Sequence, residues 1–150
     1  MQDGNKLFAV IDTNVIVSSL FSLDGTSSPA IVIKAILEGS ITPLFNDEIL
    51  QEYREVLSRP KFPFTNLQIE TVIRAFRDFG HDTNRVRITE EVFPDPDDIV
   101  FYEVKMSVED AYLVTGNIKH FPKKPFVVTP TQMVQILAEK GLLPGGTDSE

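Results

Sequence analysis

The sequence predicts a three-layer α/β/α fold in which helices cover both faces of a mostly parallel central sheet. Short, continuous apolar runs such as Leu7–Ile11 are typical of strands buried on both faces, as the strands of parallel sheets are. Segments with apolar residues at helical spacing separate these runs, and strands that alternate with helices indicate an open parallel sheet. The chain has 150 residues, 42% of them hydrophobic, which is sufficient for one compact domain.

The first strand, Leu7–Ile11, is followed by Asp12-Thr13-Asn14 and then by a segment rich in Ser and Gly, Ser22–Ser28. Pro29 suits the first turn of a helix, because its fixed backbone angle is already helical there. We therefore expect a helix at Ala30–Glu38, whose apolar positions indicate burial and after which Gly39 stops the helix.

The second strand is expected at Ile41–Phe45. Asn46 or Asp47 can cap the helix that follows, Glu48–Leu57, because both side chains accept hydrogen bonds from free backbone N–H groups. This helix has its apolar residues on one face and its glutamates on another. Thr65–Phe79 shows the same apolar spacing and predicts a further helix.

The second half of the chain continues the alternation of strands and helices. Its strands are expected around Val86 and Ile88, at Ala111–Thr115 and at Phe126–Thr129. Its helices are expected at Ile99–Val108, which the acidic turn 94–98 opens, and at Gln132–Lys140, which Pro130 and Thr131 begin.

Composition predicts the extent of the domain and excludes several kinds of segment and site. Residues 1–143 are predicted to form a single domain, and the tail 144–150 (PGGTDSE) is expected to be disordered because it has no core-forming residues. No apolar run is long enough to span a membrane, and the polar start does not resemble a signal peptide. The absence of cysteine excludes disulfides, thiolate metal sites and cysteine nucleophiles. These features favour the cytoplasm and predict no membrane partner.

The net charge is −8, which argues against a surface built to bind duplex DNA, where Lys and Arg must neutralise phosphates. It does not exclude a nuclease. Carboxylates that hold metal ions make a site acidic, and the bound cations reverse the local field.

Several acidic and amide side chains are expected at one edge of the sheet. In open α/β sheets, ligands bind beyond the carboxyl ends of the strands. Asp12 ends the first strand, Asn117 follows the strand Ala111–Thr115, and Glu52 lies in the helix after the second strand. Asp97 and Asp98 begin a helix, where carboxylates are favoured.

Oxygen ligands of this kind suit hard cations such as Mg²⁺ or Mn²⁺. Two such ions held close together can stabilise both the attacking and the leaving oxygen of a displacement at phosphorus. The chemistry needs carboxylates from distant parts of the chain and neither cysteine nor histidine, which is what the sequence offers.

Each of these residues also has a purely structural interpretation. Asp12 could cap a turn, Glu52 could be one more solvated helix glutamate, and Asn117 beside Gly116 could be a turn residue. Asp97 and Asp98 could serve as cap residues, and one of them is expected to do so.

The remaining polar residues are interpreted more simply. His81 and His120 match no metal-ligand spacing and are interpreted as ordinary polar residues, and Asp95 and Asp110 are expected to be exposed. Basic residues could contact phosphates at the rim of the site or belong to solvated loops: Arg59, Lys61, Lys119, His120, Lys123 and Lys124.

Five stretches, taken together and in this order, resemble the PIN domain, in the branch described as toxins of toxin–antitoxin systems. They span most of the chain: Val10–Val15, Glu48–Tyr53, Leu57–Lys61, Asp95–Asp98 and Tyr112–Pro122. The resemblance implies a Mg²⁺- or Mn²⁺-dependent ribonuclease, a small antitoxin partner and self-association as a homodimer.

The resemblance also implies roles for single residues. The family's first three acidic positions fall on Asp12, Glu52 and Asp98, with Asp97 as the alternative for the third. The fourth falls on Asn117, a departure that removes one negative charge and weakens the hold on a second metal ion. Three further positions match the family's site and would contact substrate or metal-bound water: Thr13, Asn14 and Thr115. Asn14 has a second interpretation, as a helix cap.

Two other classes of function compete with the ribonuclease. One is a binding or regulatory module, either a catalytically impaired PIN-like domain or a receiver-like domain. A receiver would place its phosphoacceptor Asp after the third strand, and the segment around Val86 and Ile88 ends in no such residue. The other is a phosphatase with Asp-x-Asp after its first strand, which Asn14 at the second position disfavours.

Overall fold

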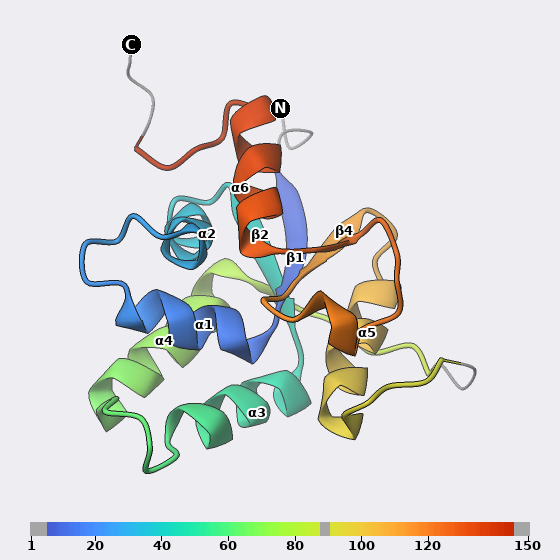
Figure 1. Ribbon diagram of the computed structural model, residues 1–150, viewed down its shortest axis with the longest axis horizontal. Coiled ribbons are helices and arrows are strands. Elements are labelled where there is room, and N and C mark those ends of the chain that lie inside the picture. Colours follow the sequence, from blue (N-terminus) through green and yellow to red (C-terminus); the bar gives the residue numbers. More distant parts are fainter. Residues whose placement is uncertain (1–5, 88–90, 146–150) are drawn as a thin grey trace.

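The computed structural model describes residues 6–87 and 91–145, and a parallel sheet of five strands forms its central layer (Figure 1). The strands lie in the order β3-β2-β1-β4-β5. They are β1 (Leu7–Ile11), β2 (Ile41–Phe45), β3 (His81–Asp82), β4 (Ala111–Val114) and β5 (Val127–Val128). The α-helices are α1 (Thr13–Phe21), α2 (Ser28–Leu37), α3 (Asp47–Leu57), α4 (Asn66–Phe79), α5 (Ile99–Met106) and α6 (Pro130–Glu139), and the short 3-10 helices are η2 (Pro96–Asp98) and η3 (Ile118–His120).

This architecture confirms the predicted three-layer α/β/α fold. Helices α2 and α6 pack against each other on one side of the sheet, and α5 packs against β1 and β4 from the other side (Figure 1). In Figure 1 the strands run towards the lower edge of the sheet, where α3 lies.

β1 occupies the centre of the sheet, as its continuous apolar sequence predicts. Val10 and Ile11 are fully buried, and β1 pairs in parallel with β2 on one side and β4 on the other. Ile11 lies opposite Val114, so the two strands end together. The residues that follow them, Asp12 and Thr115, therefore meet at the carboxyl edge of the sheet.

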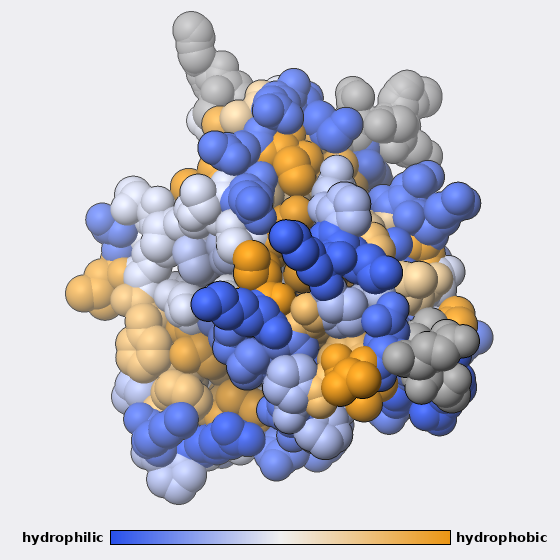
Figure 2. Space-filling model, turned by 45° about the vertical axis from the view of Figure 1, so that its right-hand side comes forward, coloured by the Kyte–Doolittle hydropathy of each residue, from blue (hydrophilic) through white to orange (hydrophobic). Residues whose placement is uncertain are grey.

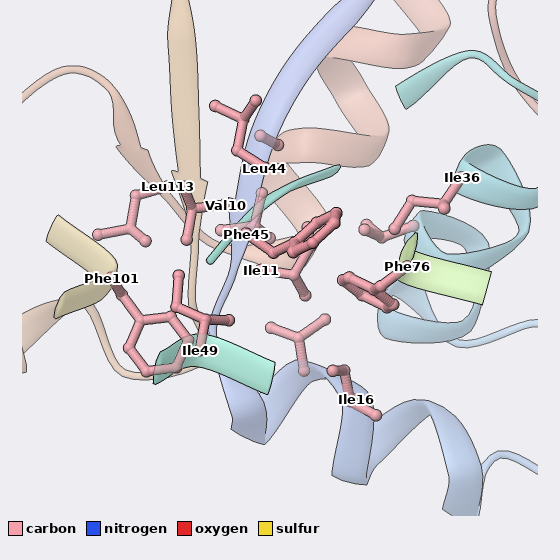
Figure 3. Packing of buried hydrophobic residues seen from close by; sticks show 14 of the residues in the cluster. Val10, Ile11, Ile16, Ile36, Leu44, Phe45, Ile49, Phe76, Phe101 and Leu113 are labelled. Carbon is pink, nitrogen blue, oxygen red and sulfur yellow. The ribbon is translucent and has the colours of Figure 1, made fainter. Parts of the chain in front are cut away.

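The core fills the space between the sheet and its helices (Figure 3). Ile36 of α2, Phe76 of α4 and Phe101 of α5 are each about 1% exposed. Burying a side chain of this size contributes roughly 1.5–3 kcal/mol. The core thus fixes the helices on the sheet and, through them, the residues at its carboxyl edge.

Hydrogen-bonded caps set the start of several helices. Asn46, rather than Asp47, caps α3 and accepts a hydrogen bond from the backbone N–H of Ile49 at 2.9 Å. Thr65 caps α4 and Thr129 caps α6, each within a reciprocal capping box that adds a glutamine side chain.

Two features differ from the expected elements. Residues 13–21 form α1, for which the sequence predicted no helix, and the helix begins directly after β1 because the Asp12 side chain caps it. The third strand is His81–Asp82, which pairs with Leu44 and Phe45 of β2. The expectation of a strand at Val86 is wrong, and Ile88 lies outside the described residues.

None of the described helices is long and apolar enough to cross a membrane. Most of the tail that was expected to be disordered, residues 146–150, lies outside the described residues. Of the rest, Gly145 donates a backbone hydrogen bond to Glu38 at 3.2 Å.

Candidate active site

A cavity of about 260 Å³ opens at the carboxyl edge of the sheet, where α1, α3, η2 and η3 meet. Its carboxylates come from three separate parts of the chain: Asp12, Glu52, Asp95, Asp97 and Asp98. Its basic side chains are Arg59, Lys61 and His120. A larger hollow of about 590 Å³ lies at the opposite edge, and among the described residues only Glu109 and Asp110 supply carboxylates there. The smaller cavity is therefore the better candidate for metal and phosphate chemistry.

Asp12 is held in place by hydrogen bonds to both of its carboxylate oxygens. Oδ1 accepts from the backbone N–H of Thr13 at 2.8 Å, and Oδ2 accepts from the Thr115 hydroxyl at 2.7 Å. Asn14 Nδ2 donates to Oδ2 at 3.2 Å. Burial raises the pKa of Asp12 above its usual value, and these hydrogen bonds oppose the rise. Asp12 caps α1 and also faces the cavity, so its structural and functional interpretations are compatible.

Asn14 is not a helix cap, because Asp12 holds that position and Asn14 lies within the first turn of α1. Its Oδ1 accepts a hydrogen bond from the Gly116 N–H at 3.0 Å. A side chain on Gly116 would bring its Cβ to 3.3 Å from the same oxygen. Asn14 therefore joins the segment after β1 to the segment after β4.

A chain of polar contacts continues from Asp12 across the cavity. The Thr115 hydroxyl, which donates to Asp12, accepts from the Asn117 backbone N–H at 2.9 Å. The Asn117 side-chain nitrogen lies 3.0 Å from Nε2 of His120, and Nδ1 of His120 lies 3.3 Å from Oδ2 of Asp98. His120 thus lies between Asn117 and Asp98, a role that its isolated position in the sequence did not reveal.

Asp98 faces the cavity from the N-cap position of α5, but its side chain makes no capping hydrogen bond. Asp95, not Asp97 or Asp98, caps η2 and accepts the Asp97 backbone N–H at 3.0 Å. Oδ2 of Asp98 is buried without a hydrogen-bond partner, although Nδ1 of His120 lies 3.3 Å away. Burial, followed by the charges of Asp12 and Asp95, raises the pKa of Asp98 to about 6.

Glu52 reaches the cavity because of its neighbour in α3. The Tyr53 side chain is fully buried and donates its hydroxyl to the carbonyl oxygen of Ile11, the last residue of β1, at 2.5 Å. This bond fixes α3 against the end of β1, one residue before Asp12. Burial, followed by the charge of Asp97, raises the pKa of Glu52 above its usual value. Glu52 is therefore not simply a solvated helix glutamate.

The donor set fits a hard divalent cation. Burial is the largest cause of the raised pKa of Asp12, Glu52 and Asp98, and neighbouring carboxylates add to it for Glu52 and Asp98. Two buried oxygens at the cavity, Thr13 Oγ1 and Asp98 Oδ2, have no hydrogen-bond partner. Within residues 6–87 and 91–145, however, no three acidic or histidine side chains lie close enough together to form a ready metal cage. Binding an ion would therefore draw these side chains together.

Most of the predicted site residues line this cavity, and Thr115 and Lys119 are the two that do not. Arg59 and Lys61 line it beside Glu52, and Asn117 lines it beside Asp12. Thr115 is fully buried behind Asp12. Lys119 does not line the cavity; it borders a separate, more apolar hollow with Phe121 and Lys123.

A sequence model described as a PIN domain matches residues 9–119, from within β1 to within η3. No curated protein and no solved structure matches the chain.

Proposed function

The chain belongs to the PIN domain family, whose fold is of the nuclease type, and from this premise we propose that it is a metal-dependent ribonuclease. The substrate would be RNA, and the reaction would be hydrolysis of a phosphodiester bond in the cavity at the carboxyl edge of the sheet. The observation that carries this proposal is the convergence of Asp12, Glu52 and Asp98, from three distant segments, on one cavity.

Asp12, Glu52 and Asp98 would hold Mg²⁺ or Mn²⁺, with Asp97 able to take the place of Asp98. When bound, the ion would lower the pKa of the attacking water and neutralise charge that develops on the phosphoryl group. Hydrogen bonds from Thr13, Asn14 and Thr115 keep the Asp12 carboxylate oriented towards the cavity.

The rest of the cavity would position the RNA. Arg59 and Lys61 supply positive charge beside Glu52, where they can receive a phosphate of the substrate. The unpartnered Thr13 hydroxyl can donate to a phosphate oxygen or to water. Asn117 contributes a neutral side chain that is bonded to His120, so it supports the site without adding charge.

The experiment that tests the proposal is a calorimetric Mn²⁺ titration combined with cleavage of single-stranded RNA in the same buffer. We expect wild type to bind Mn²⁺ and to cleave RNA only when the metal is present. Asp12→Asn should lose both properties while keeping its fold, and Asp110→Asn, at the opposite end of β4, should keep both. Full-rate cleavage by Asp12→Asn would show that the site is wrongly assigned.

A catalytically impaired PIN-like module is the second candidate, and the neutral Asn117 favours it. Metal binding without cleavage in the same experiment would support this candidate. The receiver-like alternative does not fit, because in receivers β3 lies beside β1, whereas here β1 lies between β2 and β4.

The proposal includes the toxin role that the resemblance implies, with a small antitoxin, a homodimer and a cytoplasmic location. Expression of wild type should then arrest growth, and Asp12→Asn should not. Analytical ultracentrifugation of the purified protein tests the homodimer directly, since a single monomeric species at all concentrations would exclude it.

A further inference from the structure

Three phenylalanines form a cluster beside the acidic cavity. Phe21 ends α1, and Phe62 and Phe64 lie in the connection between α3 and α4. The rings of Phe62 and Phe64 stack with an interplanar angle of 19° and centroids 5.3 Å apart. Phe21 lies 5.1 Å from Phe64 and 6.2 Å from Phe62 between centroids. We refer to these three residues as the phenylalanine cluster.

The cluster is open to solvent. Phe21 is 51% exposed, and Phe62 and Phe64 are half-buried. Phe64 packs against the main core, but Phe62 is not among the apolar residues that do. Figure 2 shows apolar side chains gathered at the left-hand edge of the molecule, next to strongly hydrophilic ones. An apolar surface that the core does not require needs another explanation.

The cluster is continuous with the cavity. Phe62 lines the cavity together with Arg59 and Lys61, so an aromatic ring, two cations and the carboxylates line one cavity. The Lys61 ammonium lies 5.2 Å from the centroid of the Phe62 ring. A nucleotide brings partners for both groups, since its base stacks on the ring and its phosphate pairs with the cations.

We propose that the phenylalanine cluster is a stacking platform for an unpaired base of single-stranded RNA, next to the phosphate that is cleaved. This inference rests on the proposed function and names its substrate class. A base within a duplex is covered on both faces and cannot reach the rings, so the platform selects unpaired segments. The cations beside Phe62 favour a nucleotide over an apolar protein partner.

The test measures binding separately from cleavage. Without divalent metal, wild type is titrated into a single-stranded RNA oligonucleotide that carries 2-aminopurine, whose fluorescence is quenched when it stacks. We expect quenching by wild type, and about tenfold weaker binding with little quenching for Phe62→Leu, because a stacked base contributes of that order to affinity. Phe62→Tyr, which keeps the ring, should behave like wild type.

Phe79→Leu provides the matched control, because Phe79 is a 45% exposed phenylalanine at the far end of α4. It should leave binding and quenching unchanged. Circular dichroism melts of all three variants establish that each is folded at the temperature of the titration.

Each outcome decides between the proposals. If Phe62→Leu binds and quenches like wild type, or if wild type does not bind RNA, the platform is refuted even where cleavage is observed. If binding depends on Phe62 but wild type does not cleave in Mn²⁺, the platform holds and the nuclease proposal fails. If Phe62→Leu turns a dimer into a monomer without weakening RNA binding, the cluster is a contact between two copies of the chain, which also overturns the platform.

Discussion

Asp98→Asn is predicted to stabilise the metal-free protein at neutral pH. The folded state raises the pKa of Asp98 from its ordinary 3.8 to about 6, because the carboxyl is partly buried beside other acids. The folded chain therefore binds this proton more tightly than the unfolded chain does. Above about pH 6, ionised Asp98 destabilises the fold, and below about pH 4, both states are protonated and the penalty disappears.

The size of the effect follows from the shift. Converted in full, a shift of about two units corresponds to roughly 3 kcal/mol. Since the carboxyl lines an open cavity and water screens it, we expect about 1–2 kcal/mol. For a chain of this length, that is an increase of roughly 2–8 °C in the melting temperature.

The assay is thermal unfolding in EDTA at pH 7.5 and at pH 4, for wild type, Asp98→Asn and Asp110→Asn. Asp110 is exposed at the opposite edge of the sheet, so its variant controls for the loss of one negative charge. Asp98→Asn should melt higher than both at pH 7.5 and close to wild type at pH 4. An unchanged or lower melting temperature at pH 7.5 would refute the argument that this site opposes folding.

Three further predictions follow from single contacts. Tyr53→Phe should lower the free energy of unfolding by about 1–3 kcal/mol, because it leaves the buried carbonyl of Ile11 without this donor, and urea denaturation would measure it. Asn117→Asp should tighten Mn²⁺ binding roughly tenfold by calorimetry, since it adds a carboxylate to the cavity; equal affinity would show that Asn117 lies outside the metal's reach. Arg85→Met should cost about 1–3 kcal/mol in urea denaturation, because it removes an ion pair with the buried Glu103, and a loss below 1 kcal/mol would show that this pair contributes little.

The sequence predicted the strands that are long and buried but not the polar one. β1 and β4 are apolar runs, and burial on both faces demands such runs. β3 has only two residues, His81 and Asp82, both exposed, and it forms because β2 offers an unpaired edge rather than because of its own composition. Because β2 is at least 36 residues away from β3 in the sequence, the residues around His81 and Asp82 give no local indication that they will pair with it.

α1 was missed for a related reason. Its sequence, TNVIVSSLF, combines β-branched residues with serines, and both types have low helix propensity. The helix forms because Asp12 caps it and because Val15 and Ile16 are buried in the core. Tertiary packing therefore overrides the low helix propensity of this segment, and the local sequence does not reveal that packing.

The sequence predicted which residues form the candidate site better than it predicted the hydrogen bonds and ion pairs among them. A strand end and a helix start locate Asp12 and Asp98, because topology brings such positions to one edge, whereas Glu52, in the middle of α3, was assigned through the family resemblance. The pattern marks His120 only as one of several basic residues that could lie at the rim, and its place between Asn117 and Asp98 depends on the turn of η3. The cap at Asp95 was likewise hidden, since neighbouring aspartates are equivalent until the backbone is known.

The bond between Thr115 and Asp12 joins residues 103 positions apart. During synthesis, Asp12 leaves the ribosome long before Thr115, the residue that donates this hydrogen bond, has been added to the chain. A nascent chain that stops short of residue 111 lacks β4, and one that stops short of residue 115 still lacks the hydroxyl that orients Asp12. If the protein cleaves RNA as we propose, this topology delays the complete site until residue 115 has been translated, so that shorter nascent chains cannot damage the RNA around them.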